Sequence, residues 1–174
     1  IGETMEKRNV TVSAIVAAIV LIGDQLSKHW AETWLRTNGE YKIWDGVLHL
    51  RYVENRGAAF GMMQGGKWFF LAITGIACAA MLYFLIKERK RLHFMMTFSL
   101  ALLLSGAIGN LIDRVALGYV RDMIYVALID FAVFNVADMA VTVGCCLLVL
   151  DLLFFKGKKY MEMMDKKPQT GENS

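Results

Sequence analysis

Several polar side chains interrupt apolar stretches of this 174-residue sequence at helical spacing. Asp24 and Lys28 are four residues apart, and Asn135 and Asp138 are three apart, so each pair shares one face of a helix. The third group consists of Asn110, Asp113 and Arg114. An ionisable side chain at membrane depth is energetically costly, and by default it marks a functional site whose partner has to be found.

Asp138 has no basic residue within reach along its own helix, so its charge must be supported from elsewhere in the fold. A second carboxylate that shares one proton with it would provide this support. Such a pair can hydrolyse a peptide bond without a metal, because one carboxylate takes a proton from water while the protonated partner donates to the carbonyl oxygen. The candidates for the second member are Asp113, Asp122 and Asp130, and spacing alone does not choose between them.

The two groups that place an acid near a base, Asp24 with Lys28 and Asp113 with Arg114, also have a structural interpretation. We favour ion pairs over direct catalysis for these four residues, and Asp113 is therefore expected to be part of the scaffold. Asn110 and Asn135 are expected to donate hydrogen bonds that fix a neighbouring carboxylate.

Apolar runs define the elements that must position these groups. Residues 68–86 and 94–112 are uncharged and long enough to cross a hydrocarbon core of about 30 Å, which takes about 20 helical residues. Residues 10–30 and 131–155 reach this length by including carboxylates. Hydrophobic residues make up 56% of the chain, above the roughly 45–50% of soluble domains. We therefore predict an all-α integral membrane protein with four transmembrane helices.

The first apolar run could instead be a cleaved signal peptide, because two basic residues precede it. Asp24, Lys28 and Trp30, however, stand where such a peptide needs small residues for cleavage. We therefore interpret residues 10–30 as a membrane span.

Basic residues predict the orientation of the helices. They cluster before the first run, between the second and third, and after the fourth: Lys7, Arg8, Lys87, Arg89, Lys90, Arg91, Lys156, Lys158 and Lys159. Positive charge marks the cytoplasmic side, so both termini are expected to be cytoplasmic and residues 31–67 and 113–130 external. This distribution accounts for most of the basic surplus behind the net charge of +3, and no nucleic-acid partner is expected.

The first external segment is expected to contain a small β-hairpin, since residues 41–44 and 47–53 are rich in aromatic and β-branched residues and flank the turn signal Asp45-Gly46. Residues 31–37 are compatible with a short interfacial helix. We predict one domain over residues 5–160, with an external β-structure at about 38–66, followed by a polar cytoplasmic tail at 161–174. The three cysteines lie in apolar runs without metal-ligand spacing, and neither a metal nor a cofactor is expected.

All three polar groups fall near the outer ends of their helices. In lipid they must satisfy one another inside the bundle, which favours a wet pocket that opens outward. Five ordered blocks of this sequence resemble those of bacterial lipoprotein signal peptidases, the signal peptidase II family: DQLSK (24–28), NRGAAF (55–60), GNLIDR (109–114), VRD (120–122) and FNVAD (134–138).

The resemblance implies an aspartic endopeptidase of the bacterial cytoplasmic membrane that works near the outer leaflet. It would remove the signal peptide from diacylglyceryl-modified prolipoproteins by cleaving just before the lipidated cysteine, with Asp122 and Asp138 as the catalytic pair. The resemblance assigns residues that shape or line the site: Asp24, Lys28, Asn55, Gly57, Asn110, Asp113, Arg114, Asn135 and Ala137. It also implies a β-cradle on the membrane surface and a short external helix after Asp122. The expected partners are precursor and membrane lipid, and the expected state is monomeric.

Some positions depart from the family pattern. Arg56 occupies a position that is often small and polar, and Arg121 stands beside a presumed catalytic carboxylate, where it could favour the charged form. The interval between Asp122 and Asp138 is short and contains an extra acid, Asp130.

A different class of function is a small proton-coupled transporter or channel that uses Asp24, Asp113 and Asp138 as a relay. The polar residues, however, gather at one face of the membrane. Asp151 stands alone near the inner end of the fourth run, so no chain of ionisable groups crosses the bilayer.

Overall fold

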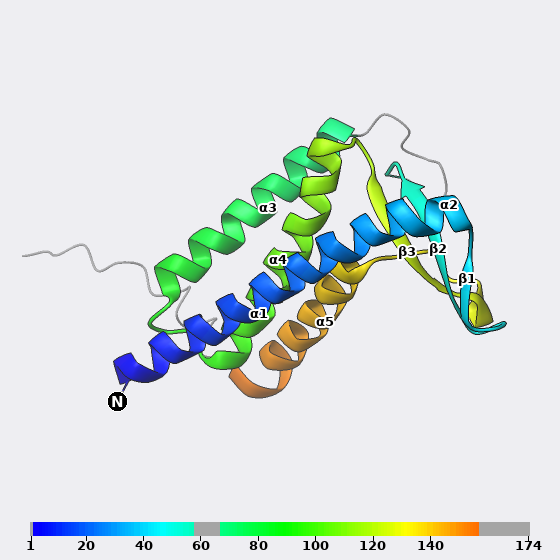
Figure 1. Cartoon of the computed structure of the whole chain (residues 1–174). Coiled ribbons are helices and arrows are strands. Elements are labelled where there is room, and N and C mark those ends of the chain that lie inside the picture. The colour runs from blue at the N-terminus through cyan, green and yellow to red at the C-terminus, as the bar shows by residue number, and fades with distance from the viewer. Residues whose placement is uncertain (1, 58–66, 157–174) are drawn as a thin grey trace, which may run out of the picture.

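Four long helices form a bundle, and a small antiparallel sheet covers one end of it (Figure 1). The helices are α1 (Gly2–Trp30), α3 (Lys67–Glu88), α4 (Phe94–Ala116) and α5 (Val136–Leu150). The strands are β1 (Tyr41–Trp44), β2 (Leu48–Asn55) and β3 (Val120–Val126). This computed structural model describes residues 2–57 and 67–156. It confirms the predicted architecture of four apolar helices with a small sheet.

Each long helix provides a segment that is apolar and long enough to cross a membrane: Arg8–Asn38, Leu71–Glu88, Phe94–Ala116 and Val136–Phe154. The first segment is longer than predicted, because α1 continues without a break through a π-helical stretch, Ala31–Leu35, and α2 (Arg36–Asn38). The helix ends at Gly39, whose φ of 84° is accessible to glycine. Residues 31–37 are therefore an extension of the first helix.

The last helix begins later than the apolar run suggested, because Asn135 caps it. The Asn135 side chain accepts a hydrogen bond from the backbone N–H of Asp138, and the Asp138 carboxylate accepts one from the backbone N–H of Asn135. This reciprocal arrangement is a capping box. Residues 131–135 precede the helix as irregular backbone, and α5 is continued beyond Leu150 by the π-helical segment Asp151–Lys156.

The sheet has the order β1-β2-β3 and is antiparallel throughout. The predicted hairpin is present and turns at Gly46, which has a positive φ of 73°. Strand β3 was not predicted, and it places Asp122 beside Val53 of β2. The short helix expected after Asp122 is a single 3₁₀ turn, Ala127–Ile129, which follows the strand.

A small apolar cluster attaches the sheet to the end of α1. Ala31, Leu35 and Met123 are buried there, and partly buried residues surround them: Leu50, Tyr52 and Ile124. The cluster joins the helical extension to β2 and β3, so the position of β3 is fixed relative to the helices.

Helix α4 is the central element, because a much larger share of its span is buried than of the other three spans. It packs against α1, α3 and α5. Small residues allow the close approach, as is usual between membrane helices. A Cβ added to Gly109 would lie 2.6 Å from Oδ2 of Asp24 on α1, and one added to Gly144 would lie 3.0 Å from the carbonyl oxygen of Ser99.

We expect Gly109→Ala to destabilise the protein by about 1–3 kcal/mol, the usual cost of forcing extra atoms into a packed interior. The added methyl would displace the Asp24 carboxylate. Gly23→Ala is the matched control, because Gly23 is the residue before Asp24 and has nothing within 4 Å of an added Cβ. Thermal unfolding in detergent should show a lower Tm for Gly109→Ala and an unchanged or higher Tm for Gly23→Ala. Equal Tm values would contradict the tight packing.

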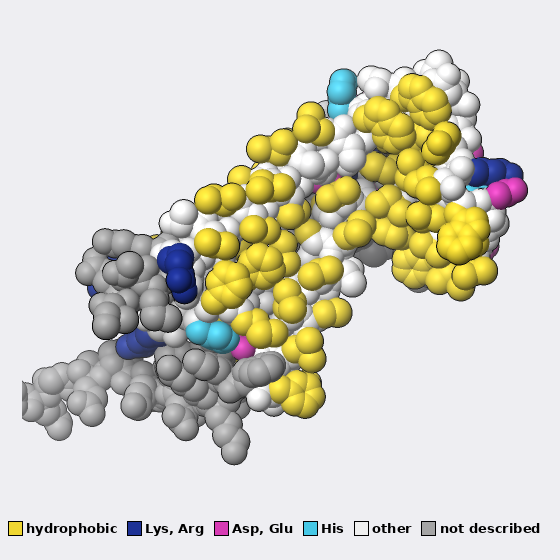
Figure 2. Space-filling view, turned by 60° about the horizontal axis from the view of Figure 1, so that its bottom comes forward, with side chains coloured by type: hydrophobic (Ala, Val, Ile, Leu, Met, Phe, Trp, Pro, Cys, Tyr) yellow, Lys and Arg dark blue, Asp and Glu magenta, His cyan; other side chains and the backbone are white. Residues whose placement is uncertain are grey.

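The face of the bundle seen in Figure 2 carries apolar side chains along its length. Ile19 on α1 is 64% exposed, and Ile76 on α3 is 70% exposed. Exposed apolar surface of this extent matches a lipid environment. Residues 58–66 of the expected β-structure and the tail at 161–174 lie outside the described residues.

Candidate active site

Asp122 is 1% exposed in the middle of the β3 region that pairs with β2. Its carboxylate accepts two side-chain hydrogen bonds. Asn55 Nδ2, at the end of β2, donates to Oδ2 over 2.9 Å, and Asn135 Nδ2 donates to Oδ1 over 2.6 Å. The carboxyl group is therefore held between the sheet and the start of α5.

Asp138 lies in the first turn of α5, where the helix dipole favours negative charge. Its Oδ2 accepts the backbone N–H of Asn135 at 3.2 Å, and its Oδ1 accepts Asn110 Nδ2 at 2.8 Å. The side chain borders a hollow of about 480 Å³ that is otherwise lined by residues 131–134 and by Met139, Thr142 and Val143 of α5. Asp138 can therefore be reached from outside the bundle.

Two asparagines connect the carboxylates. Asn135 Nδ2 donates to Asp122 and also lies 3.1 Å from Oδ1 of Asn110, while Asn110 donates to Asp138. Lys28 Nζ donates to the same Oδ1 of Asn110 at 2.8 Å, which fixes the orientation of that amide. The two aspartates thus belong to one network although they come from a strand and a helix.

A buried ion cluster supports this network from α1. Lys28 is 0% exposed, and its Nζ lies 2.8 Å from Oδ2 of Asp24 and 3.7 Å from Oδ2 of Asp113. Together with Asn110, these acceptors match the three donors of an ammonium group. The other oxygen of Asp24 accepts the backbone N–H of Ala137 over 2.9 Å, so the cluster also positions the start of α5.

Arg121 is a structural residue that the sequence analysis assigned differently. It donates two side-chain hydrogen bonds to Asp113, at 2.8 and 3.1 Å, and others to Glu32 and Gln25 of the first helix. Neighbouring residues of a strand point to opposite faces, so Arg121 turns away from Asp122 and does not stabilise its charge. Its bond to Asp113 raises the pKa of Arg121, which keeps the guanidinium charged.

Gln25 and Glu32 were also missed as members of the cluster. A signal was available, because Glu32 follows Lys28 by four residues and Gln25 precedes Glu32 by seven, so all three share one face of the continuous helix. The apolar run was taken to end at residue 30, and this face was therefore not followed into the extension.

Burial raises the pKa of Asp122 to about 6 from its ordinary value of 3.8, and the negative charge of Asp138 acts in the same direction. The hydrogen bonds from Asn55 and Asn135 oppose the shift. The structure therefore favours the protonated form of Asp122 in mildly acidic conditions.

This shift predicts a pH dependence of stability. Because the folded protein binds the Asp122 proton more tightly than the unfolded chain does, the stabilisation is complete below pH 3.8 and is lost as the pH rises through about 6. Relative to Asp122→Asn, the wild type should lose about 3 kcal/mol of unfolding free energy over the whole titration, for a pKa difference of about two units, and about 2 kcal/mol of this between pH 4.5 and 7. Thermal unfolding of both proteins between pH 4.5 and 7 measures the difference.

Asp45→Asn is a suitable control for that experiment. The Asp45 carboxylate is exposed, and its hydrogen bond with Lys42 lowers its pKa below 3.8, outside the measured interval. This variant should keep the wild-type slope. A difference in Tm between wild type and Asp122→Asn that stays constant with pH would contradict the raised pKa.

The structure also locates the remaining residues singled out from the sequence. The backbone N–H of Gly57 donates to Oδ1 of Asn55, and Gly57 has a positive φ of 98° that suits glycine. Arg114 donates to the carbonyl of Asn110 at 3.5 Å. Asp130 accepts the hydroxyl of Tyr125 at 2.6 Å and takes no part in the described network around Asp138. The rest of the NRGAAF block, residues 58–60, lies outside the described residues.

Comparison with known proteins places this chain in a family. The sequence pattern of the family described as signal peptidase (SPase) II matches residues 16–154. The chain belongs to the signal peptidase II family. The matched range contains all five sequence blocks and every side chain of the network described above, so the family match and the geometry concern the same part of the chain.

Relatives within the signal peptidase II family support the match over most of their length. A lipoprotein signal peptidase of Streptococcus thermophilus is 46% identical over 81% of this chain and 92% of its own, and one of Symbiobacterium thermophilum is 40% identical over 84% and 97%. A solved structure described as a bacterial membrane enzyme superposes with a TM-score of 0.75 at 33% identity, covering 93% of this chain and 95% of that one.

Proposed function

We propose that this chain removes signal peptides from diacylglyceryl-modified prolipoproteins, and that Asp122 and Asp138 together hydrolyse the bond before the lipidated cysteine. The observation that carries the assignment is the placement of Asn135, which hydrogen-bonds to both carboxylates in a chain of the signal peptidase II family. The substrate class follows from the relatives' names and from the resemblance of the five blocks.

The chemistry starts with Asp122 protonated and Asp138 ionised, in keeping with the raised pKa of Asp122. A water molecule between them gives a proton to Asp138 and adds its oxygen to the carbonyl carbon, while Asp122 donates its proton to the carbonyl oxygen. The tetrahedral diol then collapses: its C–N bond breaks, the amine of the lipidated cysteine takes the proton from Asp138, and Asp122 regains one from the diol. Both carboxyl groups return to their initial states.

The other assigned residues act through the aspartates. Asn55, Asn110 and Asn135 orient the carboxylates by donating to them, as their distances of 2.6–2.9 Å support. The residues of the ion cluster hold α1, α4 and β3 in place: Asp24, Lys28 and Asp113. Gly57 keeps Asn55 in position, and Arg114 contributes positive charge near both aspartates.

Ala137 has to be small. Its side chain is buried, and a Cβ on Gly109 would lie 3.3 Å from its own. A larger residue at position 137 would push α5 away from α4 and separate Asp138 from Asn110.

We place both termini in the cytoplasm of a bacterial cell and the aspartates near the outer leaflet of its cytoplasmic membrane. The N-terminal end of α1 and the basic connection between α3 and α4 lie at one end of the bundle, and the sheet lies at the other (Figure 1). Residues 5–160 act as one peptidase unit. One copy suffices in this proposal, because each member of the described network comes from a single chain. The apolar outer surface supports direct contact with membrane lipid.

The proposal is tested with the purified protein and a synthetic diacylated precursor. We expect one cleavage, with the diacylglyceryl cysteine at the new N-terminus identified by mass spectrometry. The same peptide without the lipid is the matched control and should be cut far more slowly. Cleavage at another bond, or equal rates for the two peptides, would contradict the proposed specificity.

A further inference from the structure

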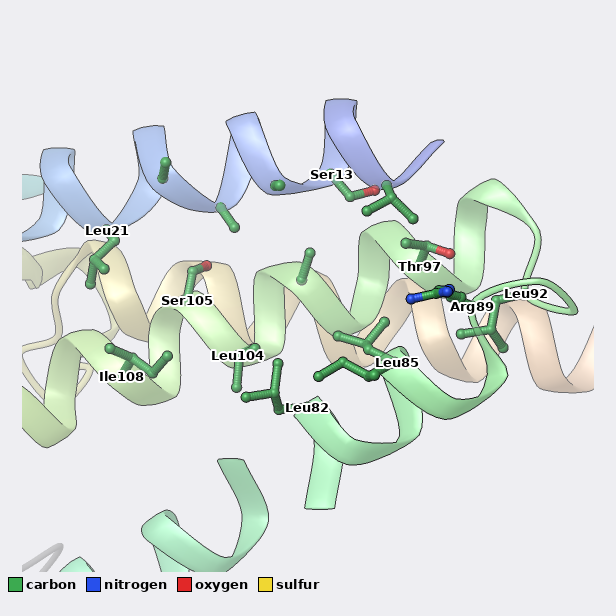
Figure 3. A pocket seen from close by; sticks show the side chains of 16 residues that line it. Ser13, Leu21, Leu82, Leu85, Arg89, Leu92, Thr97, Leu104, Ser105 and Ile108 are labelled. Carbon is green, nitrogen blue, oxygen red and sulfur yellow. The ribbon is translucent and has the colours of Figure 1, made fainter. Parts of the chain in front are cut away.

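A second cavity lies between α1, α3 and α4, apart from the two aspartates (Figure 3). Its volume is about 450 Å³, within the range of about 300–1,000 Å³ that small-ligand sites occupy. Most of its lining is aliphatic, and no residue of the aspartate network contributes to it. The cavity is therefore a separate feature of the bundle.

The cavity follows the direction in which lipid chains lie in a membrane. Its α1 wall runs from Val10 to Leu21, which corresponds to about 17 Å at 1.5 Å per residue. The hydrocarbon core of a bilayer is about 30 Å thick. The length of the cavity therefore approximates the depth of one leaflet.

Most of the polar groups of the lining lie at one end of the cavity. Ser13, Thr97 and Arg89 are at the end away from the sheet, whereas Leu21 and Ile108 line the opposite end (Figure 3). Ser105 lies nearer that opposite end, but its hydroxyl is bonded to the backbone carbonyl of Leu102. An amphiphile with its polar part beside Arg89 would match this gradient.

Ser13 carries an unused hydrogen-bonding group within this lining. The residue is 2% exposed, and its Oγ has no hydrogen-bond partner among the described residues. The other hydroxyl groups of the lining are bonded to backbone carbonyls, Thr97 to His93 over 3.0 Å and Ser105 to Leu102 over 2.9 Å. Buried hydroxyl groups are normally satisfied, so Ser13 indicates an acceptor supplied by a ligand.

The charge at the polar end indicates which amphiphile fits. Arg89 is exposed and borders the cavity, and further basic residues follow in the same connection, Lys90 and Arg91. A signal peptide would bring its own basic N-terminal region to this side of the membrane, where these charges would repel it. An anionic headgroup would instead be attracted.

We propose that this cavity binds one anionic phospholipid. One acyl chain lies along the aliphatic wall, an ester oxygen accepts a hydrogen bond from Ser13, and the phosphate lies beside Arg89. The site faces the leaflet at the end opposite the sheet, which is the cytoplasmic leaflet in the proposed topology. Its occupant would fill the space between α1 and α3, both of which pack on α4.

The test uses the full chain, purified in detergent and stripped of lipid. Native mass spectrometry with phosphatidylglycerol and with phosphatidylcholine of the same acyl chains measures both affinities. We expect the wild type to prefer phosphatidylglycerol, and Arg89→Gln to weaken its binding by about tenfold, the effect of losing one hydrogen bond to a charged group. Lys90→Gln is the matched control, because it removes one charge from the adjacent residue, which does not line the cavity; it should leave the preference in place.

Two further variants separate the cavity from general surface attraction. Ser13→Val should weaken the binding of both lipids, because both carry ester groups. Ala17→Leu, which fills the cavity wall, should do the same, whereas Val12→Leu on the exposed side of α1 should not. Equal binding of the two lipids to wild type, or equal effects of Arg89→Gln and Lys90→Gln, would overturn the proposal. Displacement of bound phosphatidylglycerol by a precursor would assign the cavity to the signal peptide and overturn it too.

Discussion

Asp122→Asn and Asp138→Asn should each slow the cleavage of a diacylated precursor by at least about a thousandfold, within the range that general acid–base groups contribute. Asparagine has nearly the same shape, but it can neither take a proton from water nor return one. The double variant should be about as slow as each single variant and not a further thousandfold slower, because the effects of residues that act as a unit are not additive. Initial rates with purified proteins measure these effects.

Asp130→Asn is the matched control, since Asp130 is an acid of the same segment that bonds to Tyr125 instead of the asparagine network. It should keep nearly the full rate. The thermal unfolding of every variant has to be recorded in parallel, so that loss of activity is separated from loss of structure. If a folded Asp122→Asn or Asp138→Asn protein turned over at a tenth of the wild-type rate, the catalytic assignment would be wrong.

Lys28→Met should lower the free energy of unfolding by about 3–5 kcal/mol, the usual effect of removing one member of a buried ion pair. Methionine keeps most of the volume but leaves the carboxylate of Asp24 without its charge partner at 2.8 Å, and Asn110 loses the donor that fixes its amide. Activity should fall as well, because Asn110 holds Asp138.

Lys42→Met provides the comparison for an ion pair at the surface. Lys42 lies 2.8 Å from Asp45, the same distance as in the buried pair, but its side chain is 56% exposed. Exposed pairs contribute about 0–1 kcal/mol, so this variant should unfold close to the wild-type temperature. Tm values measured in one detergent compare the two, and a Lys28→Met protein as stable as Lys42→Met would show that the cluster is not buried.

The sequence predicted the helices well because their signal is local. Runs of about 20 apolar residues identify membrane helices through a single physical requirement, and the Asp45-Gly46 turn identifies the hairpin in the same way. Strand β3 was missed because its partner β2 ends 65 residues earlier, at Asn55. Arg121 and Asp122 also interrupt its apolar pattern, so it resembled a loop.

The carboxylates of the site were predictable, but their partners were less so. Arg114 was expected to pair with Asp113 because it is adjacent, yet adjacent residues of a helix do not face each other. The structure gives Asp113 the partners Arg121 and Lys28, which come from a strand and from another helix. Such contacts depend on the assembled fold, and only the five blocks of the family resemblance pointed to Asp122 as the second carboxylate.

Strand β1 has a consequence for handling the protein outside a membrane. Among the described residues it pairs only with β2, and its outward side chains include Tyr41, Ile43 and Trp44. Unpaired apolar edges promote aggregation through strand addition, which a lysine or an irregularity on the edge counteracts. Lys42 and the register shift beside it serve that purpose here. Removing this protection in Lys42→Val should therefore make samples depleted of detergent aggregate faster than the wild type.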